Sequence, residues 1–283
     1  MRAIPIIAGY ALQEALRRRI FHVVLVLTAL YLGLYWLGAD TAFEEVAEAE
    51  GGLPLDEREL TGGTLFGLSM FGTLFLGAVL AVFLTLGVVR GDAERGLLQP
   101  LVVRPVGRSA LLVGRFLGAA AVCVPYVLAV YTACAVITRA AGDWWPDQFV
   151  RPGMQLAVGV LVIAALGLLG SVFLSATANG IAIFMVFGAG LVAGLLGQIG
   201  EALNSDSLES VAEWASWVLP FEALYQDALY RITAESRGLT GLAIQLGPFG
   251  GSQVGGPYLP VWTIAYFALV LGATLAAFAR KDL

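Results

Sequence analysis

Six long stretches of the sequence contain no Asp, Glu, Lys or Arg. They cover residues 20–39, 64–89, 116–138, 154–175, 181–200 and 259–279, and a helix needs about 20 apolar residues to cross a bilayer. Only 13% of the 283 residues are charged, against about 25% in soluble domains. This pattern excludes a water-soluble globular protein and a disordered chain. It predicts an all-α polytopic membrane protein with six transmembrane helices in one domain, residues 1–283.

The fourth and fifth stretches are assigned to separate spans, although no charged residue occurs between Pro152 and Gly200. Residues 175–180 are the only small, polar break there, and they predict a tight turn between antiparallel helices. The first stretch is interpreted as an uncleaved span rather than a cleaved signal peptide. Arg17 to Arg19 lie too far into the chain for a signal peptide, and Leu37 takes a position where cleavage after Ala39 needs a small residue.

Basic residues gather on one side of the predicted spans. If the N-terminus is cytoplasmic, the cytoplasmic segments hold eleven of the 16 basic residues and four of the 21 acidic ones. Basic residues favour the cytoplasmic side, so we expect a multi-pass protein with both termini in the cytoplasm. Tryptophan favours the membrane interface, and all six tryptophans then lie at or beyond the outer boundary.

Two further segments flank the spans. Residues 2–19 carry apolar side chains at helical spacing, among them Ile7, Ala11 and Ala15, and predict an interfacial helix in the inner headgroup layer. The alternative is a disordered tail. Residues 201–258 form the predicted extracytoplasmic segment, in which the amphipathic stretch 214–225 is suited to dip back toward the membrane and the Gly-rich stretch 247–256 should be irregular.

Several kinds of site are excluded by residue type. The single lysine, Lys281, cannot belong to a Gly-x-x-x-x-Gly-Lys loop for ATP phosphates. His22 is the single histidine. Cys123 and Cys134 lie about 16 Å apart along an ideal helix, which is too far to share a metal ion or a disulfide within one chain. The net charge of -5 argues against nucleic-acid binding. We therefore expect no catalytic residue, metal site, cofactor or nucleic-acid partner for this chain.

The cytoplasmic segment 90–115 connects the second and third spans. A short amphipathic helix is predicted from Asp92 to about Val103, with Asp92 as its N-cap and Pro105 ending it. Such a helix presents charged and apolar side chains to the cytoplasm, which suits the docking of another protein. The alternative is a basic loop that only fixes the topology.

This segment resembles the ABC-2 type permeases, the membrane subunits of a large class of ATP-driven exporters. The matching residues are Glu94, Arg95, Gly96, Leu97, Arg104, Pro105, Val106 and Arg108. The sequence departs from the family pattern at Leu97-Leu98, where Thr-Leu is usual, at Gly107 for Ser, and at Arg115 for Lys. The helix before the first span, the ending 278–283 and the six-span layout also resemble the family, so the resemblance covers nearly the whole chain.

The resemblance implies an ABC-2, type V exporter-like fold in the prokaryotic cytoplasmic (inner) membrane. It implies a separate ABC ATPase subunit, which binds ATP and Mg²⁺ and contacts the coupling residues Asp92, Glu94, Arg95, Gly96, Leu97, Arg104, Pro105 and Arg108. It also implies a second permease copy or a sister permease, surrounded by membrane lipid. The substrate would cross at the dimer axis, which the family lines with the second and fifth spans. In this chain their candidate lining residues are Phe66, Phe71, Phe75, Phe184, Phe187 and Gln198.

The second and fifth spans carry no charged side chain. A pathway lined this way repays little of the desolvation energy of a small ion, but it accepts an apolar or amphiphilic molecule. We therefore expect export of a hydrophobic or amphiphilic substrate. Two alternatives remain: a permease of the copper-enzyme-maturation type, with sulfur species or a maturation factor as cargo, and a membrane scaffold without transport.

Overall fold

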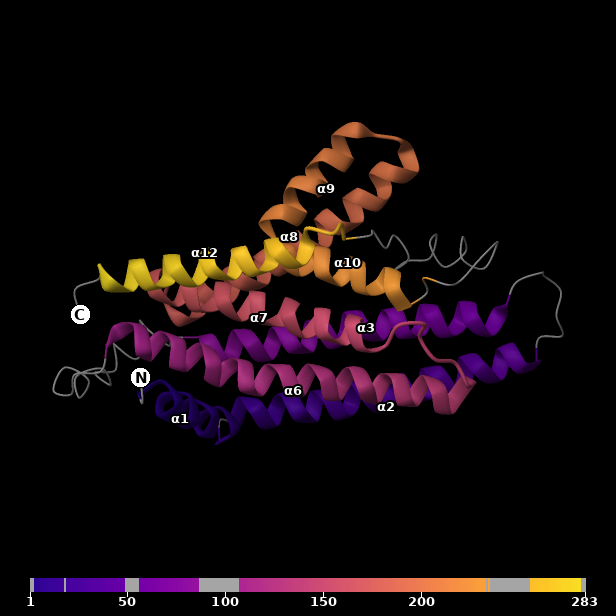
Figure 1. The fold of residues 1–283 in the computed structure, drawn as a ribbon. Helices are drawn as coiled ribbons and strands as arrows, with labels where there is room; N and C mark the ends of the chain where they lie inside the picture. The colour runs from indigo at the N-terminus through magenta and orange to yellow at the C-terminus, as the bar shows by residue number, and fades with distance from the viewer. Residues whose placement is uncertain are drawn as a thin grey trace.

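Six long helices run side by side in the computed structural model, with both chain termini at one end (Figure 1). The structure describes residues 3–17, 19–48, 56–86, 107–232, 234 and 255–280. The helices long and apolar enough to cross a membrane are α2 (Arg19–Glu48), α3 (Glu57–Thr85), α6 (Arg108–Gly142), α7 (Val150–Phe173), α8 (Ala176–Leu203) and α12 (Leu259–Ala279). The predicted all-α class with six candidate spans is confirmed.

We call the end that holds both termini, the connection from α3 to α6 and the turn from α7 to α8 the near end. The opposite end, with the connections from α2 to α3 and from α6 to α7, is the far end (Figure 1). Several helices extend beyond their apolar stretches at the far end. Helix α2, for example, continues to Glu48, because glutamate has good helix propensity once the chain leaves an apolar environment.

The turn between α7 and α8 is shorter than the sequence predicts. It comprises Leu174 and Ser175, whereas Ala176 to Gly180 already belong to α8. Asn179 accounts for the difference, because its Nδ2 donates to the carbonyl oxygen of Gly167 at 2.8 Å. The polar side chain that indicates a turn in the sequence instead joins two packed helices, where a buried amide needs a partner.

The core lies between α3, α6 and α7. Its largest fully buried side chains include Phe66 and Leu74 of α3, Tyr131 of α6, and Ile163 of α7. Helix α2 is joined to α6 by hydroxyl pairs buried in this core, of which Tyr35 Oη and Thr138 Oγ1 lie 2.5 Å apart. By contrast, only 17%, 28% and 22% of the most apolar stretches of α2, α8 and α12 are buried. The outer faces of these helices can therefore contact lipid.

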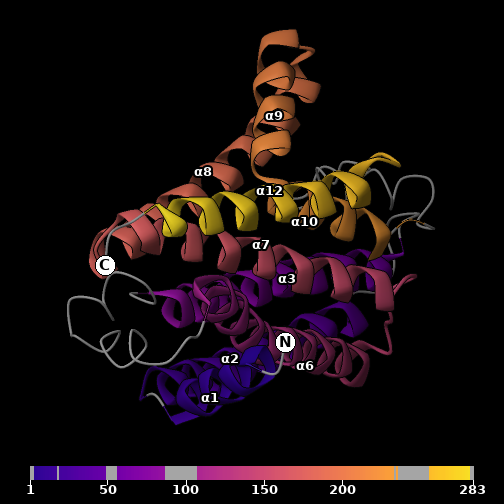
Figure 2. The same cartoon turned by 60° about the vertical axis from the view of Figure 1, so that its left-hand side comes forward.

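The segment before the first span forms α1 (Ala3–Arg17), which packs against α6 at the near end (Figures 1 and 2). Ala11 meets Gly118, where an added Cβ would lie 2.5 Å from the Ala11 Cβ. Arg115 bonds Glu14 at 2.7 Å. The apolar face predicted to lie on lipid therefore packs on a neighbouring helix, while Tyr10 stays 70% exposed.

Two shorter helices, α9 (Asp206–Val218) and α10 (Pro220–Ile232), lie in the segment 201–258. Helix α9 packs against the end of α8 and projects away from the other helices (Figures 1 and 2). Helix α10 turns back and lies along α7, with most of its residues buried. The amphipathic stretch 214–225 thus divides at Leu219 into two helices of different surroundings. Most of the Gly-rich stretch, residues 247–254, lies outside the described residues.

The topology predicted from the charges can be checked with single cysteines at Ser207 and Ser109, which are exposed in α9 and at the near end of α6. We expect an impermeant maleimide added to intact cells to label Ser207→Cys and to leave Ser109→Cys unlabelled until the cells are permeabilised. The native Cys123 and Cys134 are buried and give little background. Labelling of Ser109→Cys in intact cells would show that the orientation is opposite to the predicted one.

Candidate functional site

Four phenylalanines form a continuous row across three helices. Phe71 and Phe75 of α3 stack at a centroid distance of 6.5 Å, and Phe75 lies 6.1 Å from Phe187 of α8. Phe187 in turn stacks on Phe221 of α10 at 5.7 Å. Offset or tilted aromatic pairs at these distances are favourable beyond their buried area, so the row fixes the α3 and α8 faces relative to α10.

The candidate pathway residues have different surroundings. Phe75 is 42% exposed and Phe187 only 4%, while Phe71 and Phe184 are half-buried. Phe66 is fully buried between Tyr131 and Trp144, at 5.2 and 5.7 Å, so it lies in the core and away from the aromatic row. Gln198 belongs to α8, but its side chain lies outside the described part of the chain.

A groove of about 630 Å³ separates α3 from α8 at the near end. Phe184 lines it together with Val82 and Phe83 of α3 and Leu86, which caps that helix. The other lining residues belong to α8: Ala176, Thr177, Gly180, Ile181 and Met185. Thr177 is the single polar side chain among the lining residues that the structure describes. This groove therefore suits an alkyl or aromatic group rather than an ion, since an unpaired charge in an apolar site is costly.

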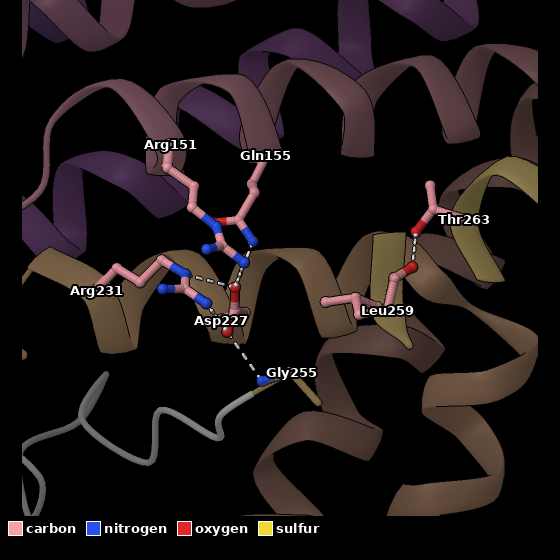
Figure 3. A network of polar contacts seen from close by, with 7 residues as sticks. All are labelled: Arg151, Gln155, Asp227, Arg231, Gly255, Leu259 and Thr263. Carbon is pink, nitrogen blue, oxygen red and sulfur yellow. Dashed lines mark hydrogen bonds and ion pairs between the residues drawn. The ribbon is translucent and has the colours of Figure 1, made fainter. Parts of the chain in front are cut away.

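A network of charged and amide groups at the far end holds α10 on α7 (Figure 3). Its centre is Asp227, whose side chain is fully buried. Arg231 donates from Nε to Asp227 Oδ2 at 2.7 Å and from Nη2 to Oδ1 at 3.1 Å. Gln155 of α7 donates from Nε2 to Oδ2 at 2.5 Å, and the Gly255 N–H donates to Oδ1 at 3.0 Å. Asp227 thus joins α7, α10 and the chain leading into α12.

Helix α10 was not predicted to be part of the packed bundle. Its buried apolar positions follow helical spacing, at Phe221, Leu224, Tyr225, Ala228, Leu229 and Ile232. Such spacing predicts an amphipathic helix whose apolar face packs against another element. This spacing can be seen in the sequence alone. The polar residues Glu222, Gln226 and Asp227, interleaved with it, are buried as well, and no sequence period distinguishes them from solvent-facing ones.

The predicted coupling segment lies largely outside the described residues. This applies to Asp92, Glu94, Arg95, Gly96, Leu97, Arg104 and Pro105, whereas Arg108 is the first residue of α6.

Within the ranges that the structure describes, no group of three His, Cys, Asp or Glu side chains is placed to hold a metal ion.

The chain matches a known protein family over nearly its whole length. The model described as "ABC-2 family transporter protein" matches residues 6–283 of the chain. None of the curated proteins matches the chain. The family match begins within α1 and extends over the other eight described helices, including α9 and α10.

Proposed function

The chain belongs to the ABC-2 family of transporter proteins, and from this premise we propose that it exports a hydrophobic or amphiphilic substrate. As a member of this family, the chain is a membrane permease component of an ABC transporter. The permease takes part in transport and is not itself catalytic. The observation that carries the substrate class is the apolar face of α3 and α8, with its phenylalanine row and its groove of about 630 Å³.

The physical argument rests on what this face offers a passing molecule. An alkyl chain that leaves lipid for the groove exchanges one apolar surrounding for another, at little cost in free energy. A small ion or a sugar loses hydrogen bonds to water, and the lining returns almost none of them. The substrate class therefore follows from the lack of polar partners along the described part of the α3–α8 face.

Permeases of this family work with an ABC ATPase subunit. For this chain, we place the docking site on the cytoplasmic segment 90–115, at the residues from Asp92 to Arg108 that resemble the family pattern. ATP and Mg²⁺ then bind to the partner ATPase, and hydrolysis drives the permease. The membrane is the prokaryotic cytoplasmic (inner) membrane, with both termini on the cytoplasmic side.

A second permease copy, or a sister permease, completes the pathway in this proposal. Exposed apolar side chains on α8 support it, with Ile181 and Met185 at 58% and 70% exposure, beside the 42% exposed Phe75 of α3. Two such faces placed opposite each other enclose an apolar passage. Membrane lipid covers the remaining exposed surfaces of α2 and α12.

The experiment is hydrolysis of ATP by the permease, purified with its ATPase and reconstituted in liposomes. We expect dodecylammonium or a lysophospholipid to stimulate hydrolysis several-fold, and glucose or sodium chloride to have no effect. Charge reversal by Glu94→Arg or Arg104→Glu should abolish the stimulation. The docking proposal requires both side chains to be exposed, and changes at exposed positions cost within about 0.5 kcal/mol of stability, so we expect this loss to occur without unfolding.

The matched control is Glu45→Arg, which reverses an exposed carboxylate in α2 at the far end and should leave stimulation intact. Stimulation by glucose or salt alone would contradict the substrate class. Hydrolysis that never responds to the permease, or failure of the two subunits to co-purify, would instead indicate a scaffold without transport.

A further inference from the structure

A cavity of about 300 Å³ lies beside α10 at the far end, apart from the α3–α8 groove. Its walls come from α8, α9, α10 and the start of α12, and they include Gly194, Trp217, Glu222, Gln226 and Trp262. A cavity of this size falls at the lower end of the range for small-molecule sites. It is walled on one side by the backbone of Gly255, which the Asp227 network holds in place.

Two buried side chains in this cavity have unused acceptor oxygens. Glu222 and Gln226 are 4% and 8% exposed, and Gln226 Nε2 donates to Glu222 Oε1 at 2.8 Å. Within the described ranges, Glu222 Oε2 and Gln226 Oε1 have no hydrogen-bond partner. Leaving buried polar atoms unpaired is costly, and most such atoms in folded proteins have a partner. The pair therefore calls for a ligand that donates at least two hydrogen bonds.

Gly194 makes room for these two groups. A Cβ atom added there would overlap Glu222 Oε1 and lie 2.9 Å from Gln226 Nε2. At Gly188, six residues earlier in α8, an added Cβ meets nothing within 4 Å. At Gly194 the α8 backbone therefore lies directly against the Glu222 carboxylate, and a side chain there would displace it.

The electrostatics of the cavity favour a cation. Its described lining carries two carboxylates, Glu213 and Glu222, and no basic side chain. Burial raises the pKa of Glu222 to about 7, and the Gln226 hydrogen bond only partly opposes this. A bound cation would offset that unfavourable burial, because an opposite charge stabilises the carboxylate form.

Two tryptophans supply the apolar part of the site. The rings of Trp217 and Trp262 meet edge to face at 5.4 Å, and Trp262 Nε1 donates to the Trp217 carbonyl oxygen at 3.0 Å. The Trp262 N–H is therefore already used, and its ring offers mainly an apolar surface. Indole faces also attract organic cations.

We infer that this cavity binds an organic ammonium ion with a small apolar or aromatic body. A small rotation of the Glu222 and Gln226 side chains, which line the cavity, turns the buried Glu222 Oε2 and Gln226 Oε1 toward the ammonium group. The body of the ligand lies against Trp217 and Trp262. An ammonium supplies up to three donors and a positive charge, which matches two acceptors and a carboxylate. All residues of this site belong to the one chain, and the inference does not depend on the proposed transport function.

The test is calorimetric titration of the full chain in zwitterionic lipid nanodiscs with 2-phenylethylammonium, after subtraction of empty nanodiscs. We expect saturable binding, and about tenfold or more weaker binding of 2-phenylethanol and 3-phenylpropanoate, which lack the positive charge. Glu222→Gln should weaken binding of the ammonium by about the same factor. Gly194→Ala should weaken it as well, because the added methyl displaces the Glu222 carboxylate.

Matched controls accompany both variants. Glu209→Gln removes an exposed carboxylate of α9 that does not line the cavity, and Gly188→Ala adds a methyl in open space; both should bind like the native chain. Thermal unfolding followed by circular dichroism confirms that each variant is folded. Absence of binding to the native chain, equal affinity for 2-phenylethanol, or unchanged affinity in both Glu222→Gln and Gly194→Ala would each overturn the assignment.

Discussion

Replacing Asp227 by Ala should lower the free energy of unfolding by about 3–5 kcal/mol, the cost of removing one partner from a buried ion pair. The Asp227 side chain is fully buried, and that of Arg231 is only 15% exposed. Without the carboxylate, the Arg231 guanidinium loses two hydrogen bonds and the Gln155 amide loses one. The loss exceeds that of an ordinary surface ion pair because little water reaches these groups.

Arg151 provides the matched control for this prediction. Its guanidinium lies 4.0 Å from the same carboxylate, but its side chain is 53% exposed. Exposed pairs contribute about 1 kcal/mol or less, so Arg151→Gln should change stability only slightly. Unfolding by denaturant in lipid nanodiscs, followed by circular dichroism, measures both variants.

A double variant separates the ion pair from the other contacts of Asp227. In Asp227→Asn with Arg231→Gln, both charges are removed, and replacing a whole buried pair is often close to neutral. We expect the double variant to be more stable than Asp227→Asn alone, which leaves the arginine uncompensated. Additive losses from the two single changes would show that the charges do not interact, and that Asp227 acts only through Gln155 and Gly255.

The six spans could be predicted from the sequence because hydrophobic length has one physical meaning in a membrane. About 20 apolar residues without charge must be shielded from water, whatever the other helices do. The predicted stretch 259–279 coincides with α12 (Leu259–Ala279). Differences elsewhere, as at Glu48 or Asn179, arise where a polar residue continues a helix or finds a partner inside it.

Which face of a span is buried was not predictable in the same way. Phe66 and Phe75 are nine residues apart in α3, so they lie on opposite faces of a helix with 3.6 residues per turn. In a helix that is apolar all round, the sequence gives no sign of which face meets the core. The structure buries Phe66 among Tyr131 and Trp144 and leaves Phe75 partly exposed beside Phe187.

The network at α10 was not predictable for a related reason. Asp227 is satisfied by Gln155, which lies 72 residues earlier in the chain, and only the tertiary fold brings them together. In the sequence, Gln155 is the second residue of the predicted span 154–175 and Asp227 lies in the predicted extracytoplasmic segment, so nothing indicates that they meet. The same holds for α1, where the pairing of Glu14 with Arg115, 101 residues away, is a contact between helices that helical periodicity cannot reveal.

Gly77→Leu should destabilise the protein by about 3 kcal/mol or more, because it overfills a packed core. Gly77 lies where α3 meets both α6 and α7. An added Cβ there would be 2.7 Å from Val160 Cγ2 and 2.8 Å from Val127 Cγ2, and both valines are fully buried. Leucine has better helix propensity than glycine by less than about 1 kcal/mol, so steric strain exceeds that gain.

Gly272→Leu is the matched change in α12, where an added Cβ meets nothing within 4 Å. It should be neutral or slightly stabilising, since only the helix propensity remains. Gly77→Ala combined with Val160→Ala should be less destabilising than the sum of the two single changes, because the shortened valine leaves space for the new methyl group. Denaturant unfolding of the two leucine variants, the two alanine variants and the double variant measures these differences. If Gly77→Leu and Gly272→Leu changed stability equally, close packing of α3 against α6 and α7 at Gly77 would be refuted.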